Sequence, residues 1–189
     1  MPSTVLAAVF CAMRHARSGW LLLVAPLLSF ASPARAGELI AGAFVHDVHT
    51  PLTKSGQENG IDLQLGWRGG RIEALRFVGA PSPHVYALVN TNGDTSFASA
   101  GLSWRIGGRV YLRPGIGLAI HNGPDRDDAT ADRIWFGSRV LFAPELAAGV
   151  RLRDRVAIEA AWLHYSHAQL FGHQNPGIDN FGVRLNFGF

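Results

Sequence analysis

Three residues near the C-terminus have side chains that together could activate a hydroxyl group. His164 and Ser166 are separated by a single residue, and Asp179 follows after a loop. A serine hydroxyl is a weak nucleophile until a base takes its proton, and a carboxylate can hold that base in the reactive tautomer. These residue types indicate ester hydrolysis, with Ser166 as the nucleophile, His164 as the base and Asp179 as the orienting acid.

The elements that position these residues are predicted to be β-strands, because apolar and polar residues alternate along the chain. From Val140 to Leu152 one face is apolar, while Glu145 and Arg151 lie on the other. Successive side chains of a strand point to opposite faces, so this period is typical of β-structure. Strands are predicted near 39–49, 60–67, 84–91, 95–105, 109–120, 138–152, 155–166 and 178–189.

Eight such strands fit either a soluble periplasmic sandwich or an outer-membrane barrel, whose apolar face points to lipid. Several features favour the barrel. The polar faces carry Arg and Glu among Gly and Ala, as a narrow packed lumen requires, and the last strand ends on aromatic Phe189. The predicted fold class is therefore all-β, an eight-stranded antiparallel transmembrane β-barrel.

The composition excludes several other classes of protein. The chain of 189 residues is 48% hydrophobic and 16% charged, with one cysteine. It is therefore neither a disordered charged protein nor a disulfide-stapled miniprotein. Its net charge of +3 comes from three arginines in 1–36, and the remainder balances 14 acidic residues with 14 basic ones. Because basic residues are not in excess, the remainder lacks the positive charge typical of nucleic-acid-binding proteins.

Residues 1–36 are predicted to be a cleaved signal peptide, followed by a single barrel domain at 37–189. The segment from Trp20 to Phe30 is apolar but shorter than the roughly 20 residues that span a bilayer. Ala34-Arg35-Ala36 matches a cleavage site, and Met13 is an alternative start. Cys11 lies in the leader, so the mature chain has no cysteine. The predicted location is the bacterial outer membrane.

His164 and Ser166 continue the apolar face of their strand, and Asp179 shares a face with Phe181 and Val183. The two strands form a hairpin, so the three polar side chains are expected to meet at its outer end. Polar groups at membrane depth are costly and are functional candidates. The alternative is that they belong to the polar and aromatic girdle at the membrane surface.

Metal binding is the other chemistry weighed for this region. A metal site from His164, His167 and His173 is a possible alternative, but their spacing matches no standard ligand motif, so no metal is predicted. The lumen-facing Glu145, Glu159, Arg113, Arg151 and Arg184 are interpreted as structural charges that pair with one another.

Loop lengths predict the orientation of the barrel, because such barrels have short periplasmic turns and longer outer loops. The loops near 50–59, 121–137 and 167–177 are predicted to be extracellular. Tight periplasmic turns are predicted at 106–108 and 153–154. The stretch 68–83 is long for a periplasmic turn, and the pattern does not place it.

The His164-Tyr165-Ser166 motif, followed by Asn175, Gly177 and Asp179, resembles the lipid A 3-O-deacylase (PagL) family. Pro114-Gly-Ile-Gly-Leu-Ala and the run from Gly137 to Gly149 also look like family segments. The resemblance implies an eight-stranded outer-membrane barrel that hydrolyses the ester-linked 3-hydroxyacyl chain at the 3 position of lipid A. It implies no cofactor, and its partner is lipid A or lipopolysaccharide of the outer leaflet.

Carried over by position, the resemblance makes Ser166 the nucleophile, His164 the base and Asp179 the acid. The family usually has Glu as the acid, and it usually has Asn where this chain has His167. His167 is therefore expected to help stabilise the oxyanion. Asn175 is expected to brace the loop or the substrate, and Phe142 to line an acyl groove.

Two other functions remain open at this stage. A non-enzymatic small barrel, used for adhesion or membrane integrity, predicts that Ser166 and His164 have no effect on lipid A. An outer-membrane phospholipase would release fatty acid from phospholipids instead. A homo-oligomer is also compatible with the sequence.

Overall fold

A computed structural model describes residues 37–53, 56–124, 133–170 and 175–189, which fold mostly as β-strands. The strands are β1 (Glu38–Val45), β2 (Ile61–Arg68), β3 (Ser82–Asn90), β4 (Phe97–Ser103), β5 (Ile106–Gly107), β6 (Val110–His121), β7 (Val140–Phe142), β8 (Glu145–Arg153), β9 (Val156–Tyr165) and β10 (Ile178–Gly188). A short 3-10 helix, η2 (Glu73–Val78), lies between β2 and β3. None of the helical segments in the described residues has the length and apolar character needed to span a bilayer.

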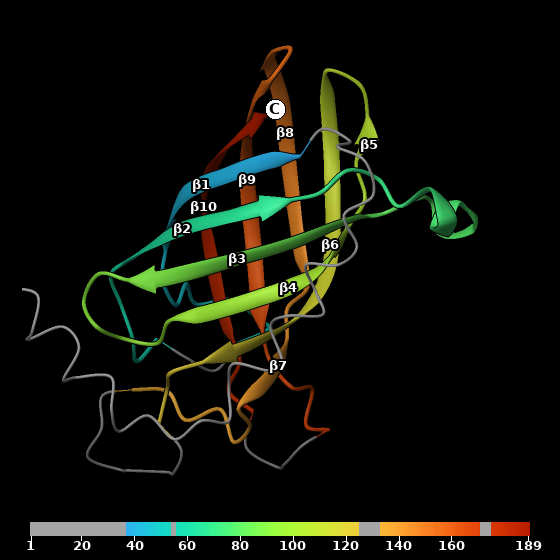
Figure 1. Ribbon diagram of the computed structural model, residues 1–189. Helices are drawn as coiled ribbons and strands as arrows, with labels where there is room; N and C mark the ends of the chain where they lie inside the picture. The colour runs from blue at the N-terminus through green and yellow to red at the C-terminus, as the bar shows by residue number, and fades with distance from the viewer. Residues whose placement is uncertain (1–36, 54–55, 125–132, 171–174) are drawn as a thin grey trace, which may run out of the picture. The chain divides into compact units, whose positions relative to one another are not determined.

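The strands form one closed antiparallel barrel. β1 pairs with both β2 and β10, and β6 connects β4 to β8, so the ladder returns to its first strand (Figure 1). Within the described residues the ten strands occupy eight positions. The short β5 and β7 pair with β6 in line with β4 and β8. The predicted eight-stranded membrane barrel is confirmed.

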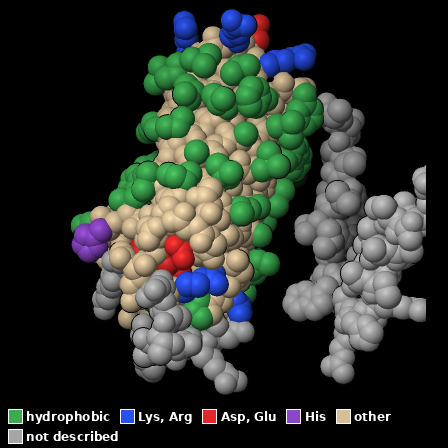
Figure 2. Space-filling model, turned by 90° about the vertical axis from the view of Figure 1, so that its left-hand side faces the viewer, with side chains coloured by type: hydrophobic (Ala, Val, Ile, Leu, Met, Phe, Trp, Pro, Cys, Tyr) green, Lys and Arg blue, Asp and Glu red, His purple; other side chains and the backbone are tan. Residues whose placement is uncertain are grey.

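The alternating residues of each strand place apolar side chains on the outside of the barrel and polar side chains inside, the reverse of a water-soluble protein. Large apolar side chains cover the outside, for example Leu65 at 69% and Ile116 at 54% exposure, while Asp62 and Arg184 are fully buried inside. Figure 2 shows hydrophobic side chains spread over the wall, with Lys or Arg side chains at its two ends and none between them on the face in view. An apolar outer wall of this extent suits lipid and not water.

Ion pairs fill the lumen. Arg184 donates from Nε to Glu159 at 2.6 Å and from Nη1 to Glu145 at 3.0 Å. Arg113 Nε donates to the same Glu159 at 2.8 Å. The four residues form one network in the lumen, as predicted, and their opposite charges compensate one another. Arg151 differs, because it lies near the end of β8 where the barrel opens, and its side chain is exposed.

The two ends of the barrel carry different connections. Glu38 pairs with Gly188 and with Arg68, so both ends of the barrel chain and the 69–81 connection lie at one end, here called the termini end. The described parts of the connections 46–60, 91–96, 122–139 and 166–177 lie at the opposite end, here called the loop end. The predicted long loops are therefore all at the same end.

The structure departs from the sequence prediction at several positions. The predicted strand 138–152 is divided at Ala143 and Pro144 into β7 and β8. β1 ends at Val45 and not near 49, because the chain turns at Asp47, whose φ is 51°. Ile106 and Gly107 form the short strand β5, and the reversal follows them. The unplaced stretch 68–83 contains η2. The predicted leader, 1–36, lies outside the described residues, and its cleavage stays a prediction.

Candidate active site

The pairing of β9 with β10 brings the three predicted catalytic side chains into one row. His164 lies opposite Asp179 in the register of the two strands. His164 Nδ1 is 2.7 Å from Asp179 Oδ1, and His164 Nε2 is 2.8 Å from Ser166 Oγ. An ionised carboxylate only accepts hydrogen bonds, so Nδ1–H donates to Asp179 and Nε2 is left to accept the Ser166 hydroxyl. The row has the geometry of a nucleophile, a base and an orienting acid.

A backbone bridge fixes Ser166 just beyond the end of β9. Phe142 N donates to Ser166 O at 2.7 Å, and Ser166 N donates to Phe142 O at 3.2 Å. Directly opposite residues of an antiparallel pair project to the same face, so the Phe142 ring and the Ser166 hydroxyl share a side of the sheet. The position expected for an acyl-groove residue is therefore next to the proposed nucleophile.

The carboxylate of Asp179 has more partners than the sequence indicated. Trp162 Nε1 donates to Asp179 Oδ1 at 2.8 Å, and the Thr50 hydroxyl donates to Oδ2. Val48 N also donates to the Asp179 backbone carbonyl at 2.7 Å. The Asp179 side chain therefore points out of the barrel, as predicted, yet is 0% exposed, because the segment after β1 covers it. Thr50 could not be recognised in advance, since nothing in the sequence links this segment to β10.

The base and the nucleophile are only partly covered. The His164 side chain is 12% exposed and Ser166 is 9% exposed, whereas the acid is fully enclosed. Gly177 keeps space beside the imidazole. Its φ is +67°, and a Cβ at this position would lie 3.3 Å from His164 Cε1. The loop before β10 thus passes close to the ring with no side chain between them.

His167 and Asn175 lie beside this row but not in it. The buried His167 imidazole is 2.8 Å from the Phe136 carbonyl oxygen, which accepts from its Nε2. Asn175 Oδ1 accepts from the His167 backbone N–H at 3.0 Å. The ring of His167 therefore anchors the loop before β7, and the oxyanion role expected for that side chain has no support in this geometry. Asn175 braces the turn after Ser166, as one of its two expected roles requires.

No group of three His, Cys, Asp or Glu side chains among the described residues is arranged to hold a metal ion. His173, the third histidine weighed for such a site, lies outside the described residues.

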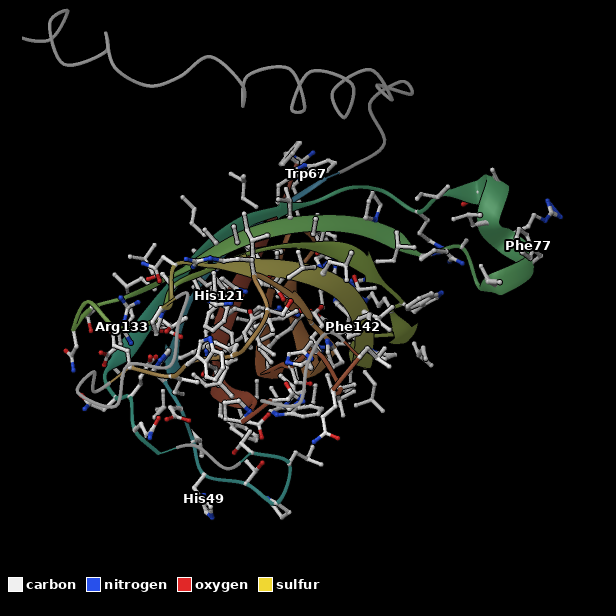
Figure 3. All side chains as sticks on the ribbon, turned by 90° about the horizontal axis from the view of Figure 1, so that it is seen from below. His49, Trp67, Phe77, His121, Arg133 and Phe142 are labelled. Carbon is white, nitrogen blue, oxygen red and sulfur yellow. The ribbon has the colours of Figure 1, made fainter. Side chains whose placement is uncertain are left out.

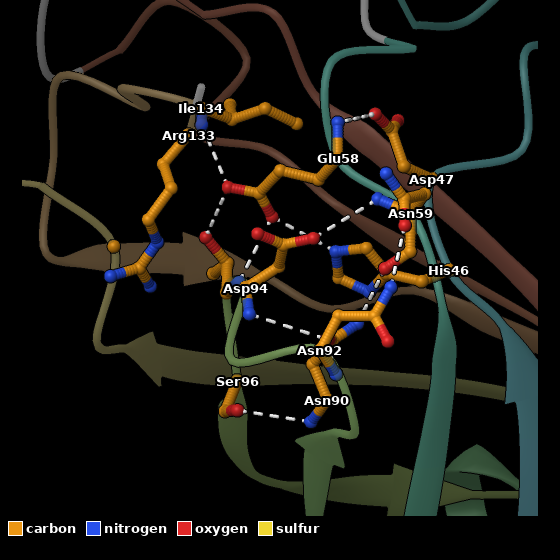
Figure 4. Close-up of polar contacts among 12 residues, drawn as sticks. His46, Asp47, Glu58, Asn59, Asn90, Asn92, Asp94, Ser96, Arg133 and Ile134 are labelled. Carbon is orange, nitrogen blue, oxygen red and sulfur yellow. Dashed lines mark hydrogen bonds and ion pairs between the residues drawn. The ribbon is translucent and has the colours of Figure 1, made fainter. Parts of the chain in front are cut away.

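A second buried cluster supports the loop end next to this site (Figure 4). His46 Nδ1 is 2.9 Å from Asp62 Oδ2, and its Nε2 is 2.9 Å from Glu58 Oε2. Glu58 accepts further hydrogen bonds from Thr95 N and Thr95 Oγ1 at 3.0 and 2.7 Å, and from Ile134 N at 2.7 Å. One carboxylate thereby connects three of the loops.

The charges of this cluster shift the pKa values of its members. Burial alone would lower the pKa of His46, but the hydrogen bonds to Asp62 and Glu58 outweigh it and raise that pKa to about 9. Burial would raise the pKa of Glu58, but its hydrogen bonds from His46, Ile134 and Thr95 hold the pKa below its ordinary value. His46 is consequently a charged partner at neutral pH. The cluster anchors the start of the segment that carries Thr50.

Comparison with known proteins gives one family and several barrels. The family model described as lipid A 3-O-deacylase (PagL) matches residues 60–187. No curated protein matches the chain. The crystal structure of the outer membrane enzyme PagL has a TM-score of 0.54 and 17% identity, and the match covers 81% of this chain and 99% of that one.

Two further structures have lower TM-scores. A de novo designed transmembrane β-barrel has a TM-score of 0.49 and 8% identity, covering 84% of this chain and 98% of the other. The Yersinia pestis outer membrane protein Ail has a TM-score of 0.48 and 13% identity, covering 82% and 100%.

Proposed function

Because the chain belongs to the lipid A 3-O-deacylase (PagL) family of outer-membrane enzymes, we propose that it removes the ester-linked 3-hydroxyacyl chain at the 3 position of lipid A through Ser166, His164 and Asp179. The observation that carries this proposal is the row of hydrogen bonds at 2.8 and 2.7 Å from Ser166 Oγ through His164 to Asp179. The row lies on the outward side of the β9–β10 hairpin.

The reaction begins with proton transfer from Ser166 to His164 Nε2. Ser166 Oγ attacks the ester carbonyl carbon, and the carbonyl oxygen becomes a tetrahedral oxyanion. Asp179 holds Nδ1–H and stabilises the imidazolium that forms, as in other serine hydrolases. When the tetrahedral intermediate collapses, the C–O bond to the sugar breaks and His164 returns its proton to the leaving 3-hydroxyl group.

The acyl group is then carried by Ser166 as an ester. Water, deprotonated by His164, attacks this ester and releases the 3-hydroxy fatty acid while Ser166 recovers its proton. We assign the oxyanion to the side-chain NH2 group of Asn175, whose Oδ1 accepts from the His167 backbone N–H at 3.0 Å and is thereby held beside Ser166.

The position of the row on the barrel suits a substrate that stays in the membrane. Ser166 and Asp179 lie at the loop end, and the wall beneath them carries exposed Ile158 and Phe181. With the long loops outside the cell, as such barrels have them, the row faces the outer leaflet. Acyl chains would lie along the apolar wall near Phe142 and Trp162 while the ester reaches Ser166.

Mass spectrometry of lipid A from cells that express the protein in the outer membrane tests this function. The expected result is lipid A lighter by one 3-hydroxyacyl group, with fragmentation that places the loss at position 3. Unchanged lipid A, with the folded protein present, would contradict the proposal. Fatty acid released from phospholipid vesicles, with lipid A intact, would show a phospholipase instead.

A further inference from the structure

Among the described residues, the 69–81 connection is the one long connection at the termini end, and the proposed chemistry does not use it. It contains η2 (Glu73–Val78) and is a built element of the fold. Two backbone hydrogen bonds extend the β2–β3 hairpin into it, from Gly69 N to Pro83 O and from Ile72 N to Pro81 O, both 2.8 Å. Arg71 closes it by donating to the carbonyl oxygens of Gly79 and Ala80 at 3.3 Å.

Two large apolar side chains of η2, those of Phe77 and Val78, are turned away from the protein. Phe77 is 79% exposed and Val78 is 50% exposed, and no residue of the helix is buried. Figure 3 shows Phe77 at the far tip of this element, away from the barrel wall. A fixed element that displays a phenyl ring in this way needs an apolar medium around the ring.

Contacts with Trp104 place η2 on the lipid side of the barrel rim. Trp104 Nε1 donates to Val78 O at 2.8 Å, and a Cβ on Gly79 would lie 3.1 Å from Trp104 Cδ1. Trp104 follows Ser103, which is 1% exposed and faces the lumen, so the indole ring lies on the outer face. Trp67, 40% exposed on the neighbouring wall, lies near the same end. Tryptophans of this kind mark the membrane–water boundary.

The same element is flanked by positive charge. Arg76 in the last turn of η2 is exposed, and so is Arg71 just before the helix. Glu73 in the first turn is the acidic residue of the 69–81 connection, so the connection has one more positive charge than negative. Apolar side chains next to arginines are typical of segments that lie in the interface of a bilayer containing anionic lipids.

We propose that η2 is an interfacial anchor at the termini end, which seats Phe77 and Val78 among the acyl chains of the phospholipid leaflet and holds Arg76 at its phosphate groups. The occupant is lipid, because η2 is continuous through Trp104 with the apolar outer wall. The proposal depends on the barrel lying in a membrane and not on its catalytic chemistry, so its failure and the failure of the deacylase assignment are separate outcomes.

Depth measurements in vesicles of phosphatidylethanolamine and phosphatidylglycerol test this anchor. Phe77→Cys, in a Cys11→Ser background of the full chain, carries a fluorescent probe, and lipids brominated along their chains act as quenchers. The controls are Leu112→Cys on the exposed outer wall and Arg153→Cys in the exposed end of β8. We expect bromolipid to quench the Phe77 probe to a similar extent as the Leu112 probe, and aqueous iodide to quench only the Arg153 probe strongly.

Two results would overturn the anchor. Strong quenching of the Phe77 probe by iodide, as at Arg153, would place η2 in water. Shielding from both quenchers that disappears on dilution of the protein in lipid would show that a second copy of the chain covers Phe77. In support, Arg76→Gln should reduce bromolipid quenching of the Phe77 probe more in vesicles with phosphatidylglycerol than in vesicles of phosphatidylcholine alone.

Discussion

His164 and Asp179 are directly opposite each other in the β9–β10 ladder, and their side chains meet at 2.7 Å on the outside of the barrel. Most outward positions of this barrel are apolar, so a hydrogen-bonded His–Asp pair at this position has a local cost. The covering segment after β1 reduces that cost by enclosing the carboxylate and donating to it from Thr50. The site is therefore formed by the β9–β10 hairpin together with the segment after β1, which is distant in the sequence.

Asp179→Asn is expected to lower kcat by about 10²–10⁴-fold, because an amide no longer selects the tautomer of His164 that can accept the Ser166 proton. The rate of 3-hydroxy fatty acid release from lipid A micelles measures the effect. Asp179→Glu is the conservative control, since it keeps the charge and should retain more activity. Equal activity of wild type and Asp179→Asn would remove Asp179 from the mechanism.

Thr50→Val is expected to lower kcat by about 3–30-fold with little change in KM, because it deletes one hydrogen bond to a charged acceptor while keeping the shape of the side chain. Thr50→Ser retains the hydroxyl and should restore most of the rate. A purely structural role of Thr50 would instead reduce thermal stability equally in both variants, with no difference in kcat between them.

Gly177→Ala is expected to reduce hydrolytic activity by more than the backbone strain of an alanine at positive φ would alone. Its φ of +67° is unfavourable for Ala, and the new Cβ would press on His164 at 3.3 Å. Gly93→Ala is the matched control, because Gly93 has φ +86° and a Cβ added there would meet nothing within 4 Å. We expect the two variants to have similar backbone strain. Only Gly177→Ala should lose hydrolysis of lipid A. Comparable activity of the two variants would contradict the close approach.

The buried cluster of His46 predicts a pH dependence of stability. The pKa of His46 is raised to about 9, so its contribution is complete below about pH 6.5 and is lost as the pH rises through 9. Glu58, whose pKa is lowered, contributes above its ordinary pKa and loses that contribution in acid. Melting temperatures should therefore fall above about pH 9 in wild type. His46→Gln should melt lower at neutral pH and lose this fall, whereas exposed His49→Gln should behave as wild type.

Arg184→Met is expected to destabilise the barrel by about 3–5 kcal/mol, since it leaves Glu145 and Glu159 without their shared partner in the lumen. Urea unfolding in detergent micelles measures the difference. Arg153→Met removes an exposed arginine and should change stability by less than about 0.5 kcal/mol. Equal midpoints for the two variants would show that the lumen network contributes little.

Side-chain alternation predicted which residues share a face, and it placed His164, Ser166 and Asp179 on the apolar faces of neighbouring strands. Alternation fits a soluble sandwich equally well, so the lipid-facing sense of these faces came from other features, such as the Arg and Glu residues set among Gly and Ala on the polar faces and the aromatic last residue. The contacts of Thr50 were not predictable, because they depend on how a loop from β1 folds over β10. The inward turn of the His167 ring follows from the same alternation one residue beyond Ser166, but resemblance to the family pointed to another role. The 68–83 stretch lacked a periodic signal, since a short 3-10 helix has none.

The central claim is that Ser166 is the nucleophile, and the most direct test is the rate at which purified Ser166→Ala releases 3-hydroxy fatty acid from lipid A. Ser82→Ala, in β3 and at the termini end, serves as the matched control. We predict a loss of at least about 10³-fold for Ser166→Ala, with the folded barrel retained and the control unaffected. Wild-type release by Ser166→Ala would contradict the account.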